Sequence, residues 1–410
     1  MSSISPNPRL GTVLNDGTLG LVALAILLVA AVLWSANSPN VEHTDFALTY
    51  VGAHIVHSGT GNRLYDTGLQ VQLRNSMFQH ASPLYFEHPP FEAVILSPLA
   101  ALPYRTAYRT WGLINVTVLL AVIMWLRPYL RWPTEDLAYL LLWLLFAPIG
   151  IAIYQGQSSI FVLAAFAAAF VQLKKGNPFA AGAVLGIGLL KFQFAVPMAV
   201  IFLFRRQFRF MGGFAASGLV LGCISLAGIG WTGLLQYIRL LSTIGTNPQN
   251  VSYGSAVDMP TLHGLLYALG GRHLGGFSLG LVVLLLSFGL LLWIALRWQP
   301  GKSPSFDPMF AASIPASLLS GMHMFTHDFS PLILGMLLIV PHRKNLSRTL
   351  QHGLTVVLIV FWAFPLYFLF VSWHCLYLMA LPMIALAYLC VRSALSTSRR
   401  DSVVQVVCAG

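Results

Sequence analysis

The sequence predicts an all-α, polytopic membrane protein, and three observations support this fold class. Hydrophobic residues make up 57% of the 410 residues and charged residues only 9%, against roughly 25% charged residues in ordinary soluble domains. Apolar runs bounded by charged residues, Pro or Gly recur along the whole chain. Because a transmembrane helix needs about 20 mostly apolar residues, about twelve membrane passes would use nearly all of them. A soluble enzyme, a disordered chain and a nucleic-acid-binding domain are excluded.

The apolar runs define the predicted spans in chain order. Two shorter runs, 178–190 and 194–204, flank Lys191. The four cysteines lie far apart without a CxxC pair, so we expect small packing residues and no metal site or disulfide framework. The longer runs lie near 18–35, 107–126, 136–153, 158–173, 210–230, 276–297, 308–324, 329–341, 353–371 and 376–395.

The distribution of Lys and Arg orients these spans. With the N-terminus in the cytoplasm, sixteen of the 23 Lys and Arg residues fall inside, six fall outside, and Lys191 remains. This agrees with the positive-inside rule and explains the net charge of +11 without a nucleic-acid partner. We therefore predict a single membrane domain that covers residues 1–410. We expect it in the inner or plasma membrane, with both termini in the cytoplasm.

The segment 178–204 is predicted to be a short hairpin. Lys174 and Lys175 before it and Arg205 and Arg206 after it are all assigned to the cytoplasm. Each arm has about a dozen residues, or roughly 18 Å of helix, which is less than a full crossing. Lys191 would then lie at the tip of the hairpin, somewhat below the outer surface.

Two long stretches, about 36–106 and 231–275, are predicted to form outer-face regions. The first stretch contains the apolar piece 89–103. If this piece crossed the membrane, every later loop would be assigned to the opposite side, so we expect it to be a short helix lying in the membrane interface. Ten of the twelve histidines also fall on or near the outer face in this topology. The chemistry is therefore expected there.

Three positions are candidates for that chemistry. Asp45 follows the first span and could act as a general base on a hydroxyl, or simply cap the helix that follows it. Lys191, a cation inside an apolar segment, could hold a phosphate or snorkel to the interface. The pair His327-Asp328 could position a ligand, bind phosphate or supply interfacial polarity; with His323 at i, i+4 it could also contribute to a metal site.

Weaker candidates lie in the two outer stretches. Glu87 and His88 precede a Pro-Pro pair in what looks like a shaped loop. Asn250 and His263 offer an amide and an imidazole suited to sugar hydroxyls, with an ordinary Asn/Pro turn as the alternative for the first. Phosphate-loop and dinucleotide motifs are missing from the sequence, so nucleotide-dependent chemistry is not expected.

Several motifs, taken in chain order, resemble those of glycosyltransferase family 87. The first group is Thr44-Asp45-Phe46 with Tyr50, followed by Gly61 and Leu64-Tyr65-Asp66. The later groups are Pro89-Pro90-Phe91, Pro98-Leu99, Leu102-Pro103, Trp111, Asn115, Leu190-Lys191-Phe192-Gln193 with Arg205-Arg206, and His327-Asp328. The similarity covers about residues 40–345. His88 departs from the Tyr that often precedes the Pro pair, and Phe192 from the Pro that often follows the Lys.

The resemblance implies a GT-C fold and a single-sugar transfer, of mannose in the best-known branch, from a polyprenyl-phosphate donor to a lipid or glycan hydroxyl. It assigns the catalytic base to Asp45, and Lys191 and the pair His327-Asp328 match positions of the family. Together with the residue chemistry above, we expect the donor phosphate at Lys191 and His327, and acceptor or sugar contacts at Asp328, Glu87, His88, Tyr50, Asn250 and His263. Inversion without a metal or other cofactor is expected, because cationic groups could stabilise the departing phosphate. The alternatives are a transporter or lipid-linked-sugar flippase, and a ligase that transfers a whole oligosaccharide.

Overall fold

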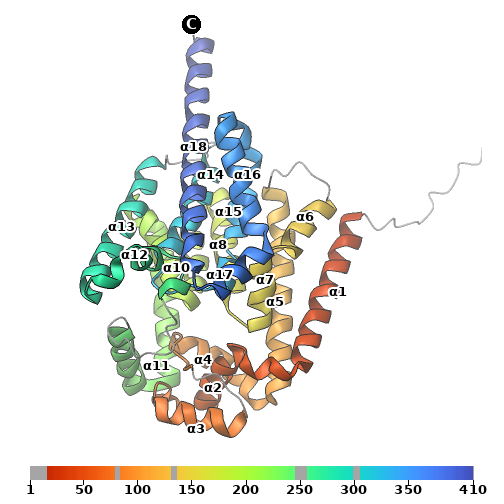
Figure 1. Cartoon of the computed structure of the whole chain (residues 1–410), viewed down its shortest axis with the longest axis vertical. Coiled ribbons are helices and arrows are strands. Elements are labelled where there is room, and N and C mark those ends of the chain that lie inside the picture. The colour runs from red at the N-terminus through yellow and green to blue at the C-terminus, as the bar shows by residue number, and fades with distance from the viewer. Residues whose placement is uncertain (1–15, 79–83, 131–135, 245–255, 299–304, 410) are drawn as a thin grey trace, which may run out of the picture.

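The computed structural model describes residues 16–78, 84–130, 136–244, 256–298 and 305–409, and no strand occurs within these ranges (Figure 1). The all-helical prediction is confirmed for these residues. The α-helices are α1 (Asp16–Asn37), α2 (Phe46–His57), α3 (Thr67–Met77), α4 (Pro90–Leu96), α5 (Tyr104–Leu126), α6 (Asp136–Leu144), α7 (Ala147–Gln155), α8 (Ser159–Lys174), α9 (Pro178–Gly186), α10 (Phe192–Phe204), α11 (Phe208–Ile244), α12 (Leu262–Ala268), α13 (Gly276–Arg297), α14 (Phe306–Leu319), α15 (Leu332–Ile339), α16 (Arg348–Trp362), α17 (Phe364–Ser372) and α18 (Ala380–Ala409).

The number of helices able to cross a membrane is smaller than predicted. In the described part of the chain, six segments are long and apolar enough, or up to eight if each of two bent pairs counts as one span. The bent pairs are α6 with α7 and α16 with α17. The protein is therefore a polytopic membrane protein, but the predicted twelve passes are not reached by this criterion.

The shortfall arises because several predicted spans are short helices that end inside the bundle. The helices α8, α14 and α15 have 16, 14 and 8 residues. At 1.5 Å per residue the two longer ones extend about 21–24 Å, short of a hydrocarbon core of about 30 Å. The helices α14 and α15 pack together as an antiparallel pair, and the chain reverses between them through a short 3₁₀ helix, η9 (Thr326–Phe329).

One of the six candidate spans, the segment 178–204, also folds back on itself and is not a single straight helix. It consists of α9, the 3₁₀ helix η5 (Ile187–Lys191) and α10. Phe210 packs its backbone against Gly182 of α9, and its ring stacks on Phe202 of α10 with 4.1 Å between ring centroids. Residues 182 and 202 would lie about 30 Å apart in a straight helix, so the contacts require a reversal, which the non-helical backbone of Lys191 (φ −128°, ψ 72°) provides.

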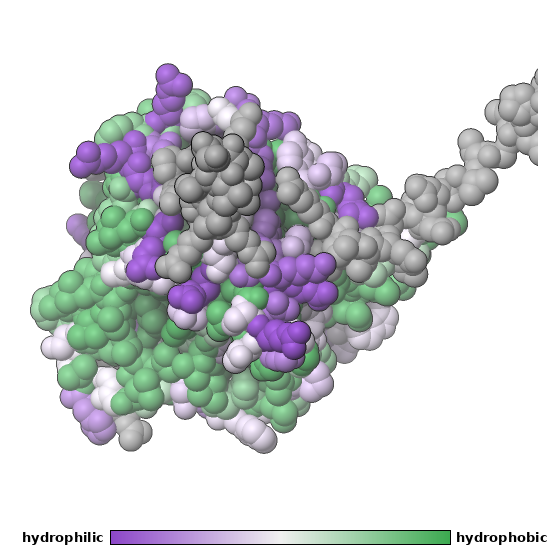
Figure 2. Space-filling view, turned by 90° about the horizontal axis from the view of Figure 1, so that it is seen from above, coloured by the Kyte–Doolittle hydropathy of each residue, from purple (hydrophilic) through white to green (hydrophobic). Residues whose placement is uncertain are grey.

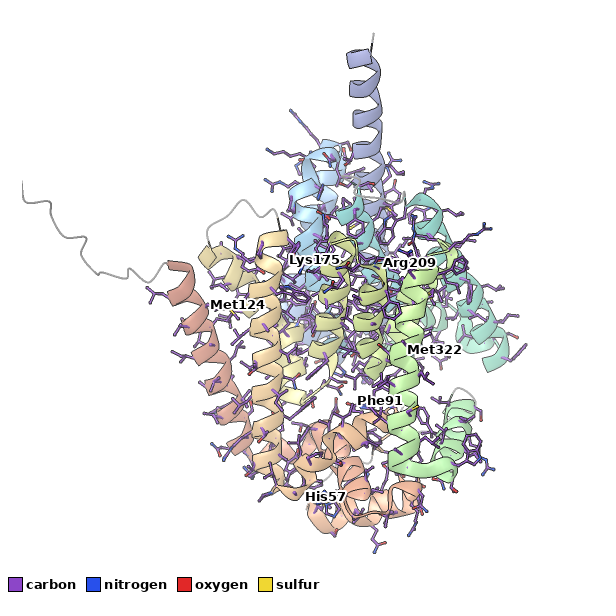
Figure 3. The ribbon with its side chains drawn as sticks, turned by 180° about the vertical axis from the view of Figure 1, so that it is seen from behind. His57, Phe91, Met124, Lys175, Arg209 and Met322 are labelled. Carbon is purple, nitrogen blue, oxygen red and sulfur yellow. The ribbon has the colours of Figure 1, made fainter. Side chains whose placement is uncertain are left out.

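The positions of two residues assigned to the cytoplasm can be compared with that of a residue assigned to the outer face. Lys175 and Arg209 lie toward the end of the molecule from which the C-terminus projects, and His57 lies at the opposite end (Figure 3). Hydrophilic side chains are also concentrated on this face, with a broad hydrophobic area beside them (Figure 2). The assignment of this charged end to the cytoplasm stays a prediction.

The first predicted outer stretch folds into a small second core at the end opposite the C-terminus. It contains η1 (Pro39–His43), α2, η2 (Gly61–Arg63), α3, α4 and η3 (Ser97–Ala101), packed on the beginning of α5. The apolar piece 89–103 forms α4 and η3 and buries Pro90, Phe91 and Leu96. Several hydrophobic side chains of this piece are therefore covered by protein, whereas Ile95 remains 52% exposed. In the second stretch, the long helix α11 changes direction at Gly230 (φ 66°, ψ 179°).

Candidate functional site

Three chain reversals meet inside the protein and bring polar side chains together. Gln157 follows α7 in the turn before α8, Lys191 ends η5, and Asp328 lies in η9. The Lys191 Nζ donates to Asp328 Oδ1 at 2.6 Å and to Gln157 Oε1 at 2.8 Å. These contacts join residues separated by 34 and 137 positions in the sequence into one buried polar cluster.

Asp328 is the most fully bonded member of the cluster. Its Oδ1 also accepts from the Ser159 hydroxyl at 2.9 Å, and its Oδ2 accepts from the Phe325 N–H at 3.0 Å. His327 Nε2 lies 3.4 Å from the same Oδ2. Burial alone would raise the pKa of Asp328, but the charges of His327 and Lys191 hold it well below its usual range. Asp328 is therefore an ionised carboxylate whose charge is balanced inside the protein.

Lys191 is correspondingly buried and paired. Only 6% of the residue is exposed, so the alternative in which it snorkels to the membrane interface is wrong. An ammonium group has three N–H donors, of which two are used by Asp328 and Gln157. Among the described contacts no acceptor is bonded to the third donor.

Asp45 lies at the edge of this cluster and is only half-buried. It precedes α2, but its side chain makes no capping hydrogen bond there, so the helix-cap alternative is wrong. Its Oδ2 instead accepts from Gln157 Nε2 at 2.6 Å, and its backbone N–H donates to Gln155 Oε1 at 3.1 Å. No described residue donates a hydrogen bond to its second oxygen, Oδ1. Asp45 therefore combines a fixed carboxylate with one oxygen open to a ligand.

Two further histidines lie within electrostatic range of the cluster. His88 Nδ1 lies 2.9 Å from Glu92 Oε2, and 34% of its side chain is exposed. Burial lowers the pKa of His88, but the Glu92 carboxylate outweighs this effect and the net pKa is raised, while Lys191 and Asp45 also act on it. Burial lowers the pKa of His323 to about 4, although the charge of Asp328 opposes this shift. The pKa values of the two rings are therefore shifted in opposite directions.

The turn that carries Gln157 is held rigidly by α5. Tyr108 and Trp111 donate to the carbonyls of Tyr154 and Gly156 at 2.6 and 2.7 Å. Gly156 ends α7 with φ 65°, and a Cβ there would lie 2.6 Å from the Cβ of Phe46. Glycine is required at this position both for its left-handed backbone and for the close packing against α2. The tight turn sets the position of Gln157 beside Asp45.

The other predicted site residues lie outside this network or cannot be placed in it. The Tyr50 hydroxyl donates to the Leu102 carbonyl at 2.7 Å and its ring packs on Tyr104, so it is a packing residue of the second core. Glu87 is half-buried next to His88 in the chain. His263 is the second residue of α12, with its Nδ1 buried and no hydrogen bond to the cluster among the described contacts. Asn250 lies outside the described residues.

The predicted pairing of His323 and His327 on one helix face is wrong. The chain leaves α14 after Leu319, passes through a turn and an extended segment, and enters η9 at Thr326. Among the residues that the structure describes, no group of three His, Cys, Asp or Glu side chains is arranged to hold a metal ion. Asp328 instead pairs with Lys191.

The sequence reasoning missed Gln155, Gln157, Ser159 and Glu92. The first three belong to the run Gln155-Gly156-Gln157-Ser158-Ser159, which interrupts two apolar runs. Polar residues on both sides of a glycine at such a break are a usable signal in the sequence. Glu92 was visible as an acid within an apolar stretch, four residues after His88.

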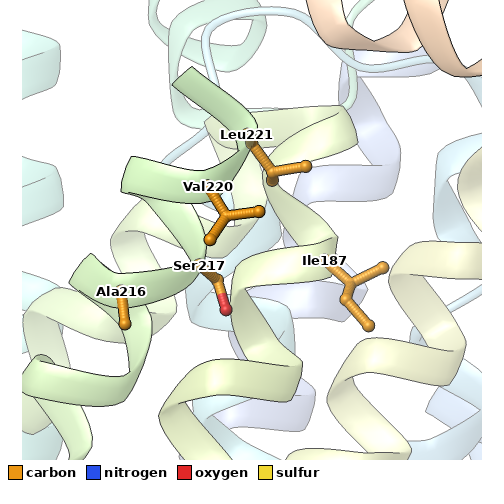
Figure 4. Close-up of a pocket in the computed structure, with 5 residues that line it drawn as sticks. All are labelled: Ile187, Ala216, Ser217, Val220 and Leu221. Carbon is orange, nitrogen blue, oxygen red and sulfur yellow. The ribbon is translucent and has the colours of Figure 1, made fainter. Parts of the chain in front are cut away.

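An apolar groove lies at the start of η5, the 3₁₀ helix that ends at Lys191. It has a volume of about 280 Å³ and is formed between η5 and α11, as Figure 4 shows. Four of its five lining residues are apolar. The fifth is Ser217, whose hydroxyl donates to the Ala183 carbonyl. Ile187 and Val220 expose about half of their surface, 48% and 58%. The lining residues are Ile187, Ala216, Ser217, Val220 and Leu221.

Comparison with known proteins agrees with the resemblance in the motifs. The model of glycosyltransferase family 87 matches residues 86–325, which is more than half of the chain. The match contains Gln157 and Lys191, whereas Asp45, His327 and Asp328 lie outside it and join these residues only in the folded structure. No curated protein and no solved structure matches the chain. The match over more than half of the sequence, on a helical membrane-protein fold, shows that the chain belongs to glycosyltransferase family 87 and is a membrane glycosyltransferase.

Proposed function

We propose that this glycosyltransferase transfers a single sugar, mannose, from a polyprenyl-phosphate donor to a hydroxyl of a glycolipid or glycan acceptor, with inversion. The reaction would take place on the extracytoplasmic face of the cell membrane. The observation that carries the proposal is the half-buried Asp45 carboxylate, which has one oxygen fixed by Gln157 and one open, beside the Lys191–Asp328 pair.

Asp45 is the general base in this mechanism. Its open Oδ1 accepts the proton of the acceptor hydroxyl as that oxygen attacks the anomeric carbon of the sugar. The bond between the anomeric carbon and the donor phosphate oxygen breaks on the opposite face, and polyprenyl phosphate leaves with the bonding electrons. One displacement inverts the configuration, so a β-linked donor gives an α-linked product.

The departing phosphate is stabilised by cationic groups. Lys191 keeps one N–H donor after pairing with Asp328 and Gln157. His327 and His88 lie in the same region and supply further N–H groups, depending on their protonation. Such fixed donors stabilise the negative charge that develops on the leaving group. Glu87, Asn250 and His263 remain proposed contacts to the acceptor or sugar, whereas Asp328 would act indirectly, by holding Lys191.

The apolar groove between η5 and α11 suits the isoprenoid tail of the donor. Its exposed apolar side chains would face lipid in a membrane. Ile187 of the groove and Lys191 are the two ends of η5, and four residues of 3₁₀ helix rise about 8 Å. A tail in the groove would therefore leave its phosphate within a short distance of Lys191.

The proposal is tested by transfer from a defined donor. Purified protein in lipid nanodiscs is incubated with radiolabelled polyprenyl-phosphate mannose and a membrane extract as acceptor source. We expect transfer of single labelled sugars by the wild type and a loss of at least a thousandfold in rate for Asp45→Asn, because the amide cannot accept the proton.

Asp66→Asn is the matched control. Asp66 lies in the same region, is paired with exposed Arg63 and caps α3, a role that Asn also fills. Its transfer rate is expected to remain within twofold of the wild type. Transfer by Asp45→Asn at the wild-type rate would overturn the assignment of the base. Movement of intact donor between leaflets without transfer would instead favour a flippase.

A further inference from the structure

The side chain of Gln157 bridges the open carboxylate of Asp45 and the buried Lys191–Asp328 pair. Its Nε2 donates to Asp45 Oδ2 at 2.6 Å and its Oε1 accepts from Lys191 Nζ at 2.8 Å. The residue is 6% exposed, and its backbone lies in the turn that Gly156 and Trp111 fix. Both ends of the amide are therefore engaged and have little room to move.

The chemistry of Lys191 determines which way the amide points. An ammonium group has donors only, so the atom that faces Lys191 must be the amide oxygen. The NH₂ group must then face Asp45. Lys191 is itself held by Asp328, which is fixed in turn by Ser159 and the Phe325 N–H. The orientation of the Gln157 amide is thus set by a pair of charges on the far side from Asp45.

We propose that Gln157 is a positioning residue that presents a hydrogen-bond donor to Asp45 and thereby holds it as an unprotonated carboxylate, with the Lys191–Asp328 pair fixing the direction of the amide. This inference rests on the proposed function, in which Asp45 is the base. A donor at this position favours the ionised form of a carboxylate. It also occupies Oδ2, so that only Oδ1 is presented to the acceptor hydroxyl.

Other titratable and charged groups lie around Asp45 and the buried pair, and the test must separate their effects from that of Gln157. They come from several elements packed near it, as well as from its own segment. The groups are Glu42 and His43 before Asp45, Tyr104 and Arg105 of α5, His88 and Glu92 at α4, Lys191 of η5, His323, and His327 and Asp328 of η9.

The test compares two charge-matched variants in the same turn. Gln157→Glu replaces the donor facing Asp45 by a carboxylate, and two carboxylates in contact share one proton over a wide pH range. Gln155→Glu adds the same charge two residues away. Its side-chain oxygen accepts from the Asp45 backbone N–H, and among the described contacts no hydrogen bond joins it to the Asp45 carboxylate, which is bonded by Gln157. The pH dependence of kcat/KM for the labelled donor is measured for both, together with the wild type and Asp45→Asn.

We expect Gln157→Glu to move the acid limb of the pH profile upward by at least one pH unit, and Gln155→Glu to move it by less than half a unit. Size-exclusion chromatography and the melting temperature establish that each variant is folded. If Gln157→Glu does not fold, Gln157→Met serves instead. It removes the donor without adding charge, and we expect an upward shift of at least half a unit and a kcat reduced at least tenfold, with the KM for donor within threefold.

Equal shifts for the two Glu variants would show a general charge effect and overturn the inference. An unshifted acid limb in Gln157→Glu and Gln157→Met, with Asp45→Asn inactive, would also overturn it and leave Asp45 as the base. Full activity of Asp45→Asn would remove the base from the proposed function, and the role of Gln157 with it. The inactive Asp45→Asn variant thus separates failure of the inference from failure of the proposed function.

Discussion

Replacement of Lys191 by Met should destabilise the protein strongly, because it strands a buried carboxylate. The Nζ of Lys191 lies 2.6 Å from Asp328 Oδ1, and the two side chains are 7% and 1% exposed. At an effective dielectric constant of about 20, unit charges at this separation attract by about 6 kcal/mol, much of which offsets the cost of burying both charges. Removing one partner leaves the other uncompensated, and we expect a loss of about 3–5 kcal/mol.

The loss can be measured by unfolding purified protein in mixed micelles with increasing SDS, followed by tryptophan fluorescence and checked for reversibility. Lys191→Met, Asp328→Asn and the double variant form a double-mutant cycle. Asn at 328 retains the capacity to bond Ser159 and the Phe325 N–H without a charge. The double variant should therefore be more stable than the sum of the single losses by at least about 2 kcal/mol.

Lys344→Met is the control for the loss of a lysine charge at an exposed position of η10. Its effect should stay within about 0.5 kcal/mol. A change below about 1 kcal/mol for Lys191→Met, or single effects that simply add, would refute the reasoning. Either result would mean that the pair does not carry complementary buried charges.

Three further expectations concern the turn, the pH dependence and metal removal. Gly156→Ala should lower the free energy of unfolding by about 1–2 kcal/mol, because alanine disfavours the left-handed backbone. It should also lower the transfer rate by displacing Gln157, because the new Cβ would lie 2.6 Å from the Cβ of Phe46. Unchanged SDS unfolding and unchanged transfer would contradict this. The pKa of His323 falls to about 4 on folding, so its contribution to stability should be complete above the unfolded value of about 6.5 and disappear as the pH falls from there. His323→Gln should make SDS unfolding less dependent on pH between about 4 and 6.5, and an unchanged slope would count against a buried neutral ring. Transfer should persist after EDTA treatment followed by desalting, and recovery only on adding a divalent cation would show that a metal is needed.

The family and the helical membrane fold follow from short-range features of the sequence. Composition and apolar runs of span length are sufficient to indicate a polytopic helical protein. The match over residues 86–325 agrees with the motifs around Pro89-Pro90 and Lys191. Lys191 stood out because a cation within an apolar run needs a compensating partner.

The number of passes could not be predicted in the same way. An apolar run of 14–16 residues has the same composition whether it crosses the bilayer or ends inside the bundle. The helix α8 begins and the helix α14 ends near interior turns. Side chains from distant parts of the chain satisfy polar groups there, as Lys191 does for Gln157 and Asp328 does for Ser159. Hydropathy contains no information about those partners.

The sequence by itself determined that this is a helical membrane protein of glycosyltransferase family 87, and it identified Asp45, Lys191, His327 and Asp328 as residues of interest. Only the tertiary structure decided that Lys191 is paired with Asp328 and that the Asp45 carboxylate is held by Gln157 and does not cap α2. The physical reason is that a buried charge or amide is satisfied by partners from distant segments. Here these are the turns at residues 157, 191 and 328, which meet only when the helices pack.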